Sequence, residues 1–60
     1  MKYAKTNESV RVEIYDRAGR YAETVKRLLY KGLRGTFIKY KGSYYKTSYS
    51  YSENVFRVWV

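Results

Sequence analysis

The segment Ser9 to Tyr15 alternates between apolar and polar side chains, with Val10, Val12 and Ile14 on one side of an extended chain. A period of two residues predicts a half-buried β-strand. Residues 16–19 follow with an aspartate and a glycine. These residue types suit either the cap and first turn of a helix or a tight turn into another strand.

The segment Arg20 to Lys31 predicts a helix of about three turns. At 100° per residue its apolar side chains gather within about a third of the helical circle. They are Tyr21, Ala22, Val25, Leu28 and Leu29. The opposite side carries Arg20, Glu23, Thr24, Arg27 and Lys31. Gly32 and Gly35 come next, and a glycine after cationic residues is typical of a helix C-terminus.

Three further segments are rich in aromatic and β-branched residues and are separated by turn residues, which predicts three strands. They are Thr36 to Lys41, Tyr44 to Tyr51 and Val55 to Val60. The expected order is β-α-β-β-β. The sequence therefore predicts an α+β fold, with one amphipathic helix packed on one face of a small, mainly antiparallel sheet.

Charge favours one register for the first predicted hairpin. A Gly42-Ser43 loop would place Lys39 opposite Lys46, and like charges facing each other are destabilising. A Lys41-Gly42 loop avoids this repulsion, because it sets Lys39 opposite Tyr44 and Phe37 opposite Lys46. We expect the second register. It places Ile38, Tyr40, Tyr45, Thr47, Tyr49 and Tyr51 on the core face.

The last strand could present either of its sides to the core. Burying Arg57 without a partner is costly. We therefore expect Arg57 and Trp59 on the open side of the sheet. The inward side would then carry Phe56, Val58 and Val60.

Sixty residues predict a single domain over 1–60, with residues 1–8 as a weakly ordered lead-in. A chain this short buries only about 60% of its unfolded surface, so its core is small. There is no cysteine, which excludes a disulfide framework and favours a reducing cytoplasm. No long apolar run occurs, so no membrane association is expected.

Thirteen Lys and Arg against five Asp and Glu give a net charge of +8. This charge is only slightly more than solubility requires of a small domain. It also suits a polyanion, because a positive field speeds encounter with nucleic acid and binding releases counterions. Charge alone therefore indicates a class of partner without identifying it.

The predicted open face of the sheet interleaves aromatic rings with cations, which suits stacking on bases and pairing with phosphates. Its residues are Phe37, Lys39, Tyr44, Lys46, Arg57 and Trp59. Aromatic residues are also favoured in strands whatever their role, and exposed lysines prevent aggregation at sheet edges. A purely structural explanation of this face therefore has equal weight.

A second cationic group follows the predicted helix and is suited to secondary phosphate contacts. It consists of Arg17, Arg20, Arg27, Lys31 and Arg34. The same stripe is also the ordinary polar face of an amphipathic helix, with Glu23 supporting Arg27 at i,i+4.

Catalysis has little support in the sequence. There is no histidine, no cysteine nucleophile, no phosphate-binding glycine motif and no cluster of carboxylates for a metal. We expect no cofactor, no metal and no catalytic residue. A histidine-free ribonuclease remains an alternative, since Tyr, Lys and Arg can polarise a phosphate.

The segment Glu23 to Leu29, followed by Phe37 to Tyr44, resembles the helix-strand-turn of HicA-type RNA-cleaving toxins. That resemblance implies a dsRNA-binding-like fold. The family has histidine after its Gly-Ser pair, where this chain has Tyr44, so the resemblance does not carry the catalytic activity over.

The sequence thus predicts a small, basic, non-enzymatic protein that binds single-stranded or structured RNA or DNA. The alternative is a protein-interaction module or phage-type inhibitor that docks on an acidic surface of a nucleic-acid-processing complex, since Tyr, Trp and Arg are also enriched at protein interfaces. A homodimer formed through Val55 to Val60 is a third possibility, if that strand lies at the sheet edge.

Overall fold

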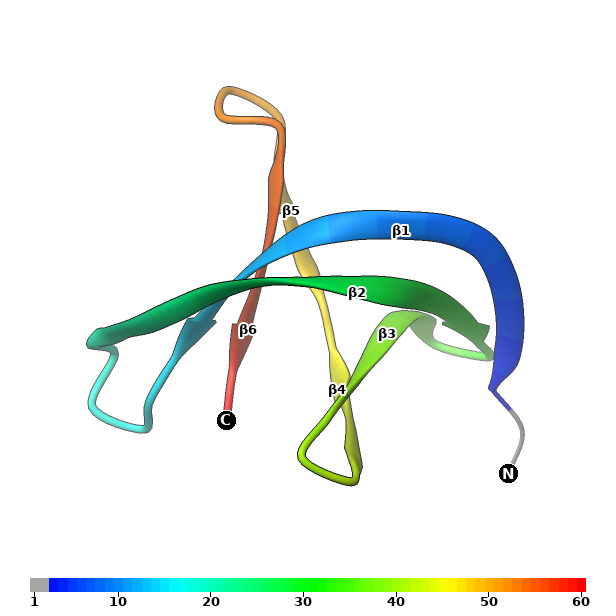
Figure 1. The fold of residues 1–60 in the computed structure, drawn as a ribbon, viewed down its shortest axis with the longest axis horizontal. Coiled ribbons are helices and arrows are strands. Elements are labelled where there is room, and N and C mark those ends of the chain that lie inside the picture. The colour runs from blue at the N-terminus through cyan, green and yellow to red at the C-terminus, as the bar shows by residue number, and fades with distance from the viewer. Residues whose placement is uncertain (1–2) are drawn as a thin grey trace.

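The computed structural model describes residues 3–60, which form six β-strands and no helix. The strands join into one curled, mixed sheet that resembles half of a barrel, in the order β4-β3-β2-β1-β6-β5 (Figure 1). Their bounds are β1 Ala4–Tyr15, β2 Tyr21–Gly32, β3 Gly35–Tyr40, β4 Ser43–Lys46, β5 Ser48–Ser50 and β6 Val55–Trp59.

The predicted helix over Arg20 to Lys31 is wrong, because this segment is the central strand β2. Strand β2 pairs with β1 on one side and with β3 on the other, both antiparallel. The α+β fold with a packed helix is therefore wrong as well. The helix implied by the resemblance to HicA-type toxins is absent from residues 3–60, which leaves that resemblance without structural support.

The turn that leads into β2 is the tight-turn alternative that Asp16 and Gly19 had left open. Oδ1 of Asp16 accepts hydrogen bonds from the amides of Ala18 and Arg20, each 2.9 Å long. The backbone of Asp16 also bonds to Gly19 and Arg20 at 3.0 and 2.9 Å. Gly19 has a φ of 81°, a conformation that glycine adopts without steric cost. These bonds reverse the chain and begin a hairpin in place of a helix.

The predicted register of the hairpin between β3 and β4 is confirmed. Lys39 pairs with Tyr44, and Phe37 pairs with Lys46. Lys41 and Gly42 form the turn with φ values of 51° and 84°. Two successive positive φ angles define the type I′ turn, whose twist matches that of the flanking strands.

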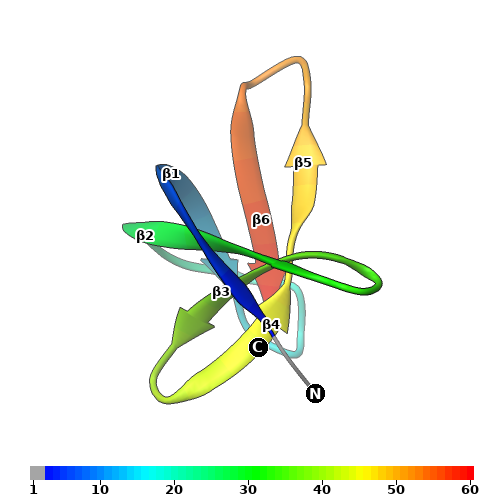
Figure 2. The same ribbon diagram turned by 90° about the vertical axis from the view of Figure 1, so that its right-hand side faces the viewer.

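The segment predicted as one strand over Tyr44 to Tyr51 divides into β4 and β5 at Thr47. The Thr47 amide donates to the Thr36 carbonyl at 2.9 Å, and its hydroxyl hydrogen-bonds to that of Thr36 at 2.5 Å. Beyond this bend β5 pairs with β6. Consecutive residues therefore supply both edge strands of the sheet, which curls around the core (Figure 2).

Strand β6 lies inside the sheet, where it runs parallel to β1 and antiparallel to β5. The condition for a homodimer through Val55 to Val60 was an edge position, and β6 does not meet it. Residues 4–8 of the predicted lead-in belong to β1. The first two residues of that lead-in lie outside the described part of the chain.

The core fills the concave side of the sheet with side chains from β1, β2, β3 and β6. Its buried members are Val12, Ile14, Leu29, Ile38, Tyr40 and Val58. Phe56 and Val60 pack against them, so the predicted inward side of the last strand is confirmed. Within residues 3–60 there is no helix of the length and apolarity needed to cross a membrane.

Candidate nucleic-acid interface

A row of aromatic and cationic side chains crosses the outer side of the sheet. Lys5 of β1 pairs with Tyr30 of β2, Tyr30 pairs with Phe37 of β3, and Phe37 pairs with Lys46 of β4. Residues paired across strands point to the same face of the sheet. The row therefore presents two aromatic rings flanked by two ammonium groups.

Tyr44 and Tyr3 extend this row into a group of contacting rings. The Tyr3 ring stacks on Tyr44 with the centroids 4.3 Å apart and contacts Phe37 at 4.7 Å. Tyr30 meets Tyr44 edge to face at 5.2 Å. Together with the neighbouring lysines these residues form what we term the aromatic-lysine patch. Its members are Tyr3, Lys5, Tyr30, Phe37, Lys39, Tyr44 and Lys46.

Gly32 makes this ring packing possible. A Cβ atom at this position would lie 2.8 Å from a carbon of the Phe37 ring and 3.1 Å from one of the Tyr3 ring. Both distances are shorter than ordinary van der Waals contact. Any larger residue at position 32 would therefore displace rings of the aromatic-lysine patch.

The lysines of the patch are exposed and lie beside the rings. Nζ of Lys39 is 5.8 Å from the centroid of Tyr44, within cation-π range. Lys5 and Lys46 are also exposed. No salt bridge within residues 3–60 involves these three lysines, whose charges are available to an anion.

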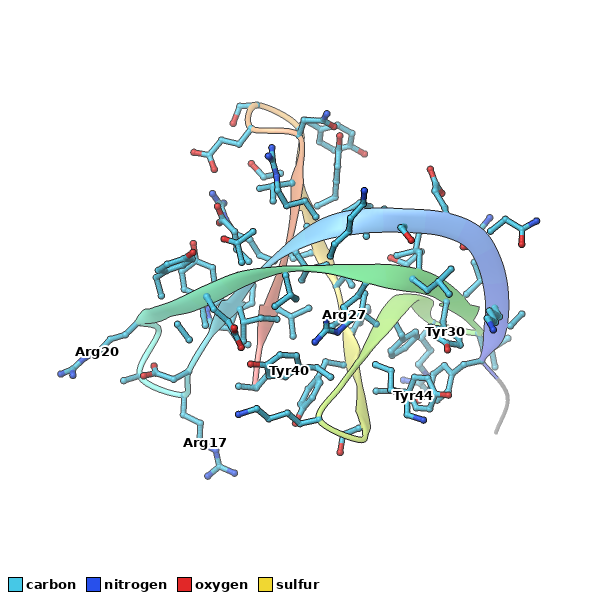
Figure 3. The ribbon with its side chains drawn as sticks, in the orientation of Figure 1. Arg17, Arg20, Arg27, Tyr30, Tyr40 and Tyr44 are labelled. Atoms are coloured by element: carbon cyan, nitrogen blue, oxygen red, sulfur yellow. The ribbon has the colours of Figure 1, made fainter. Side chains whose placement is uncertain are left out.

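Tyr44 is the most exposed ring of the patch at 38%, while Tyr3, Tyr30 and Phe37 are half-buried. Tyr30 and Tyr44 lie toward one end of the long axis of the molecule, and the β1–β2 turn with Arg17 and Arg20 lies at the other (Figure 3). The rings thus offer a firm but accessible stacking surface.

The structure does not bring Arg57 and Trp59 into this patch. Both side chains are on the outer side of β6, as predicted, but β6 is hydrogen-bonded to β1 and β5 and not to β3 or β4. Trp59 stacks on Tyr15 at 5.3 Å. The predicted face of six residues therefore divides into two groups, with Phe37, Lys39, Tyr44 and Lys46 in the first.

Carboxylates already engage Arg57. Its Nε donates to Glu13 at 3.0 Å, and its Nη2 contacts Glu53. The Tyr15 hydroxyl donates to the same Glu13 oxygen at 2.9 Å. These bonds explain why Arg57 is half-buried on an outer face, and they make it a weaker candidate for a phosphate contact than the unpaired lysines.

The same hydrogen bonds shift the pKa values of Glu13 and Tyr15. Arg57 first, and then Tyr15, hold the pKa of Glu13 below its ordinary value of 4.5 by hydrogen-bonding to the carboxylate. The hydrogen bond to Glu13 raises the pKa of the Tyr15 phenol above 10.0, because it favours the protonated form. The carboxylate and the phenol are thus both held in their neutral-pH forms.

Lowering the pH is expected to remove the contribution of Glu13 to the stability of the fold. Unfolded Glu13 takes up a proton more readily than folded Glu13, so its stabilisation is present above pH 4.5 and is lost as the pH falls through the lower folded pKa. Thermal melts between about pH 5 and about pH 3 should show a steeper loss of stability for the wild type than for Glu13→Gln. Parallel losses in the two proteins would contradict the assignment.

The cations predicted for secondary phosphate contacts do not form a stripe, because the helix that would align them is absent from residues 3–60. Arg17 and Arg20 project from the β1–β2 turn (Figure 3). Arg34 lies in the turn between β2 and β3, and Lys31 pairs with Thr36 near that turn. Arg27 points to the concave side, with its guanidinium 5.7 Å from the centroid of the Tyr40 ring.

Three members of the aromatic-lysine patch are absent from the sequence-based prediction. Tyr3 and Lys5 belong to the presumed lead-in, and Tyr30 belongs to the presumed helix. An alternating assignment of β2 would have found Tyr30, because it follows Lys26 and Leu28 on one side of the strand. Nothing in the sequence alone places Tyr3 over β3 and β4.

The concave side holds a smaller group of polar side chains. The Tyr40 hydroxyl donates to Glu23, and this bond raises the pKa of the phenol above 10.0. Arg27 and Lys41 both lie within 6 Å of the Tyr40 ring centroid, at 5.7 and 5.5 Å. Tyr40 is buried, and the bond to Glu23 satisfies its hydroxyl within the fold. In the described part of the chain no three His, Cys, Asp or Glu side chains are grouped to hold a metal ion.

Comparison with protein families, with curated proteins and with solved structures finds no match to this chain. The chemistry of the surface is therefore what indicates a function.

Proposed function

We propose that this protein binds nucleic acid through the aromatic-lysine patch, without cleaving it. The observation that carries the proposal is the row Lys5, Tyr30, Phe37 and Lys46, with contacting rings and unpaired lysines on one face. Bases stack on such rings whatever their sequence, and the ammonium groups follow the phosphate backbone. Unpaired bases fit best, because stacking on a protein ring requires an exposed base face. We also propose a cytoplasmic location, which the absence of cysteine favours.

The charges of the chain support this proposal. Of the five acidic residues, Glu13 and Glu53 contact Arg57, Glu23 accepts a bond from Tyr40, and Asp16 closes a turn. The carboxylates are thus largely used within the fold. Apart from Arg57, the lysines and arginines of residues 3–60 form no salt bridge and remain to attract a polyanion, and those of the patch have rings beside them.

A salt titration tests the proposal. Three lysines contacting three phosphates of a single strand predict that the logarithm of affinity falls with the logarithm of salt concentration at a slope of about −2. Fluorescence anisotropy with a 3′-labelled, 5′-phosphorylated trinucleotide, which carries three phosphate groups, measures this slope. The double variant Lys39→Gln/Lys46→Gln should reduce it to about −0.7.

The matched control is Arg17→Gln/Arg20→Gln, which removes the same charge from the β1–β2 turn at the other end of the molecule. We expect the control to keep the slope of the wild type. No binding at low salt, or equal slopes in the two double variants, would reject the proposal. Gel analysis of recovered RNA should show intact strands, and cleavage products would favour the ribonuclease alternative.

A further inference from the structure

A cleft opens where β1 leaves β6. The parallel pairing of these strands begins at Val12 and Phe56, and before Val12 strand β1 has no partner on this side within residues 3–60. The space has a volume of about 770 Å³. That volume falls in the range of about 300 to 1,000 Å³ typical of small-molecule sites. The free edge of β1 also offers backbone donors and acceptors.

The cleft combines an apolar floor with a polar and cationic rim. Val10, Val25 and Phe56 supply the apolar surface, and Tyr49 adds an aromatic ring 4.8 Å from that of Phe56. The remaining lining residues are polar or charged. They are Glu8, Ser9, Arg11, Thr24, Lys26 and Asn54.

Two of these rim residues form an unfavourable pair. Arg11 of β1 lies directly opposite Lys26 of β2, and like charges at facing positions destabilise a sheet. Both side chains are exposed, and neither forms a salt bridge within residues 3–60; Glu13, two residues along the same side of β1, attracts Arg11 only at longer range. An anion bound between them would relieve it. We term this site the Arg11-Lys26 cleft.

The register of β2 connects the cleft with the aromatic-lysine patch. Lys26, Leu28 and Tyr30 occupy alternate positions of β2, so their side chains point to the same outer face. The four residue-to-residue steps from Lys26 to Tyr30 span about 13 Å of strand. A phosphate backbone can therefore run along this outer face from the patch to Arg11 and Lys26. Phe56 and its partner Tyr49 lie on the concave side, so a base reaches them past the free edge of β1.

We propose that the Arg11-Lys26 cleft takes one unpaired nucleotide of the strand bound at the aromatic-lysine patch. Its phosphate lies between Arg11 and Lys26 on the outer face, and its base turns past the free edge of β1 to pack on Tyr49 and Phe56. This inference rests on the proposed function and deepens it, because a base can enter the cleft only when it is unpaired. The ligand is thus a single-stranded segment longer than the patch alone requires.

The test compares a trinucleotide, which covers the patch, with a decanucleotide, which also reaches the cleft. For the decanucleotide, five phosphate contacts predict a salt slope of about −3.5. The variant Arg11→Gln/Lys26→Gln should bind the trinucleotide like the wild type and the decanucleotide roughly tenfold more weakly, with a slope of about −2. Its melting temperature should stay equal or rise by roughly 1 to 5 °C, since the repulsion is removed.

The control Arg17→Gln/Arg20→Gln changes the net charge equally and should bind both oligonucleotides like the wild type. Equal decanucleotide affinities for the two double variants would overturn the cleft site while leaving the proposed function intact. If the wild type binds neither oligonucleotide at low salt, both proposals fail together. A second measurement is the NMR titration of a 5′-mononucleotide, which should shift the amides of Arg11, Lys26 and Tyr49. Shifts confined to other residues would also overturn the site.

Discussion

Replacing Ile38 with alanine is expected to remove about half or more of the stability of this protein. Ile38 is 0% exposed and belongs to the core cluster with Val12, Ile14 and Val58. An isoleucine-to-alanine change in a packed core costs about 2 to 5 kcal/mol. A domain of 60 residues has a free energy of unfolding of only about 3 to 9 kcal/mol. Urea unfolding followed by circular dichroism measures the loss.

Leu33→Ala provides the matched control, because it also truncates an aliphatic side chain in the same region of the sheet. Leu33 is 90% exposed in the turn between β2 and β3. We expect its free energy of unfolding to change by less than about 0.5 kcal/mol. Similar losses in the two variants would mean that Ile38 does not occupy the core. Because Phe37 and Lys39 flank Ile38, its loss should also weaken the aromatic-lysine patch.

Strand β2 shows why a helical period of apolar residues can occur in a segment that forms a strand. Its apolar residues satisfy a helical period, while a strand places Glu23 and Arg27 on the same inner side as Val25 and Leu29. Two charged residues on a core-facing side break the simple alternation that identifies a strand. They are tolerated because Tyr40 contacts both: its hydroxyl donates to Glu23, and its ring lies beside the guanidinium of Arg27. Tertiary contacts of this kind override local propensity and are not visible in the sequence.

Local pairing was predictable, and long-range pairing was not. The register of the β3–β4 hairpin followed from the charges of Lys39 and Lys46, which are separated by one turn. The inward side of β6 followed from the cost of burying Arg57. The parallel pairing of β1 with β6 joins residues more than 40 positions apart, and no local pattern specifies it. That pairing places Arg57 beside Glu13, where the two form a salt bridge, and keeps Arg57 away from the predicted site.

Only part of the candidate site could be predicted, because local pairing was predictable and long-range pairing was not. Phe37, Lys39, Tyr44 and Lys46 lie on one hairpin, so a correct register sufficed to place them together. Lys5 and Tyr30 required the pairing of β1 with β2, which the assumed helix ruled out. The candidate patch in the structure is thus smaller at β6 and larger at β1 and β2 than the sequence indicated.

Replacing Tyr44 with alanine is expected to give the largest loss of nucleic-acid affinity among single ring substitutions. Tyr44 contacts the rings of Tyr3 and Tyr30 and is still 38% exposed, so a base can stack on it with a fixed orientation. Loss of one stacking ring costs about 1 to 3 kcal/mol, or roughly 5-fold to 150-fold in affinity. Tyr44→Phe keeps the ring and should bind within about twofold of the wild type. Anisotropy at fixed low salt measures all three proteins.

Tyr21→Ala is the control that separates stacking from a general effect of removing tyrosine. Tyr21 is 58% exposed and contacts Tyr15, beside Trp59, rather than any ring of the aromatic-lysine patch. We expect its affinity to stay within about twofold of the wild type, since no base stacks there. Trp59 is the single tryptophan of the chain, so its emission reports on that second group. A fall in affinity for Tyr21→Ala, together with quenched Trp59 emission on binding, would move the interface to β6 and reject the patch on β3 and β4.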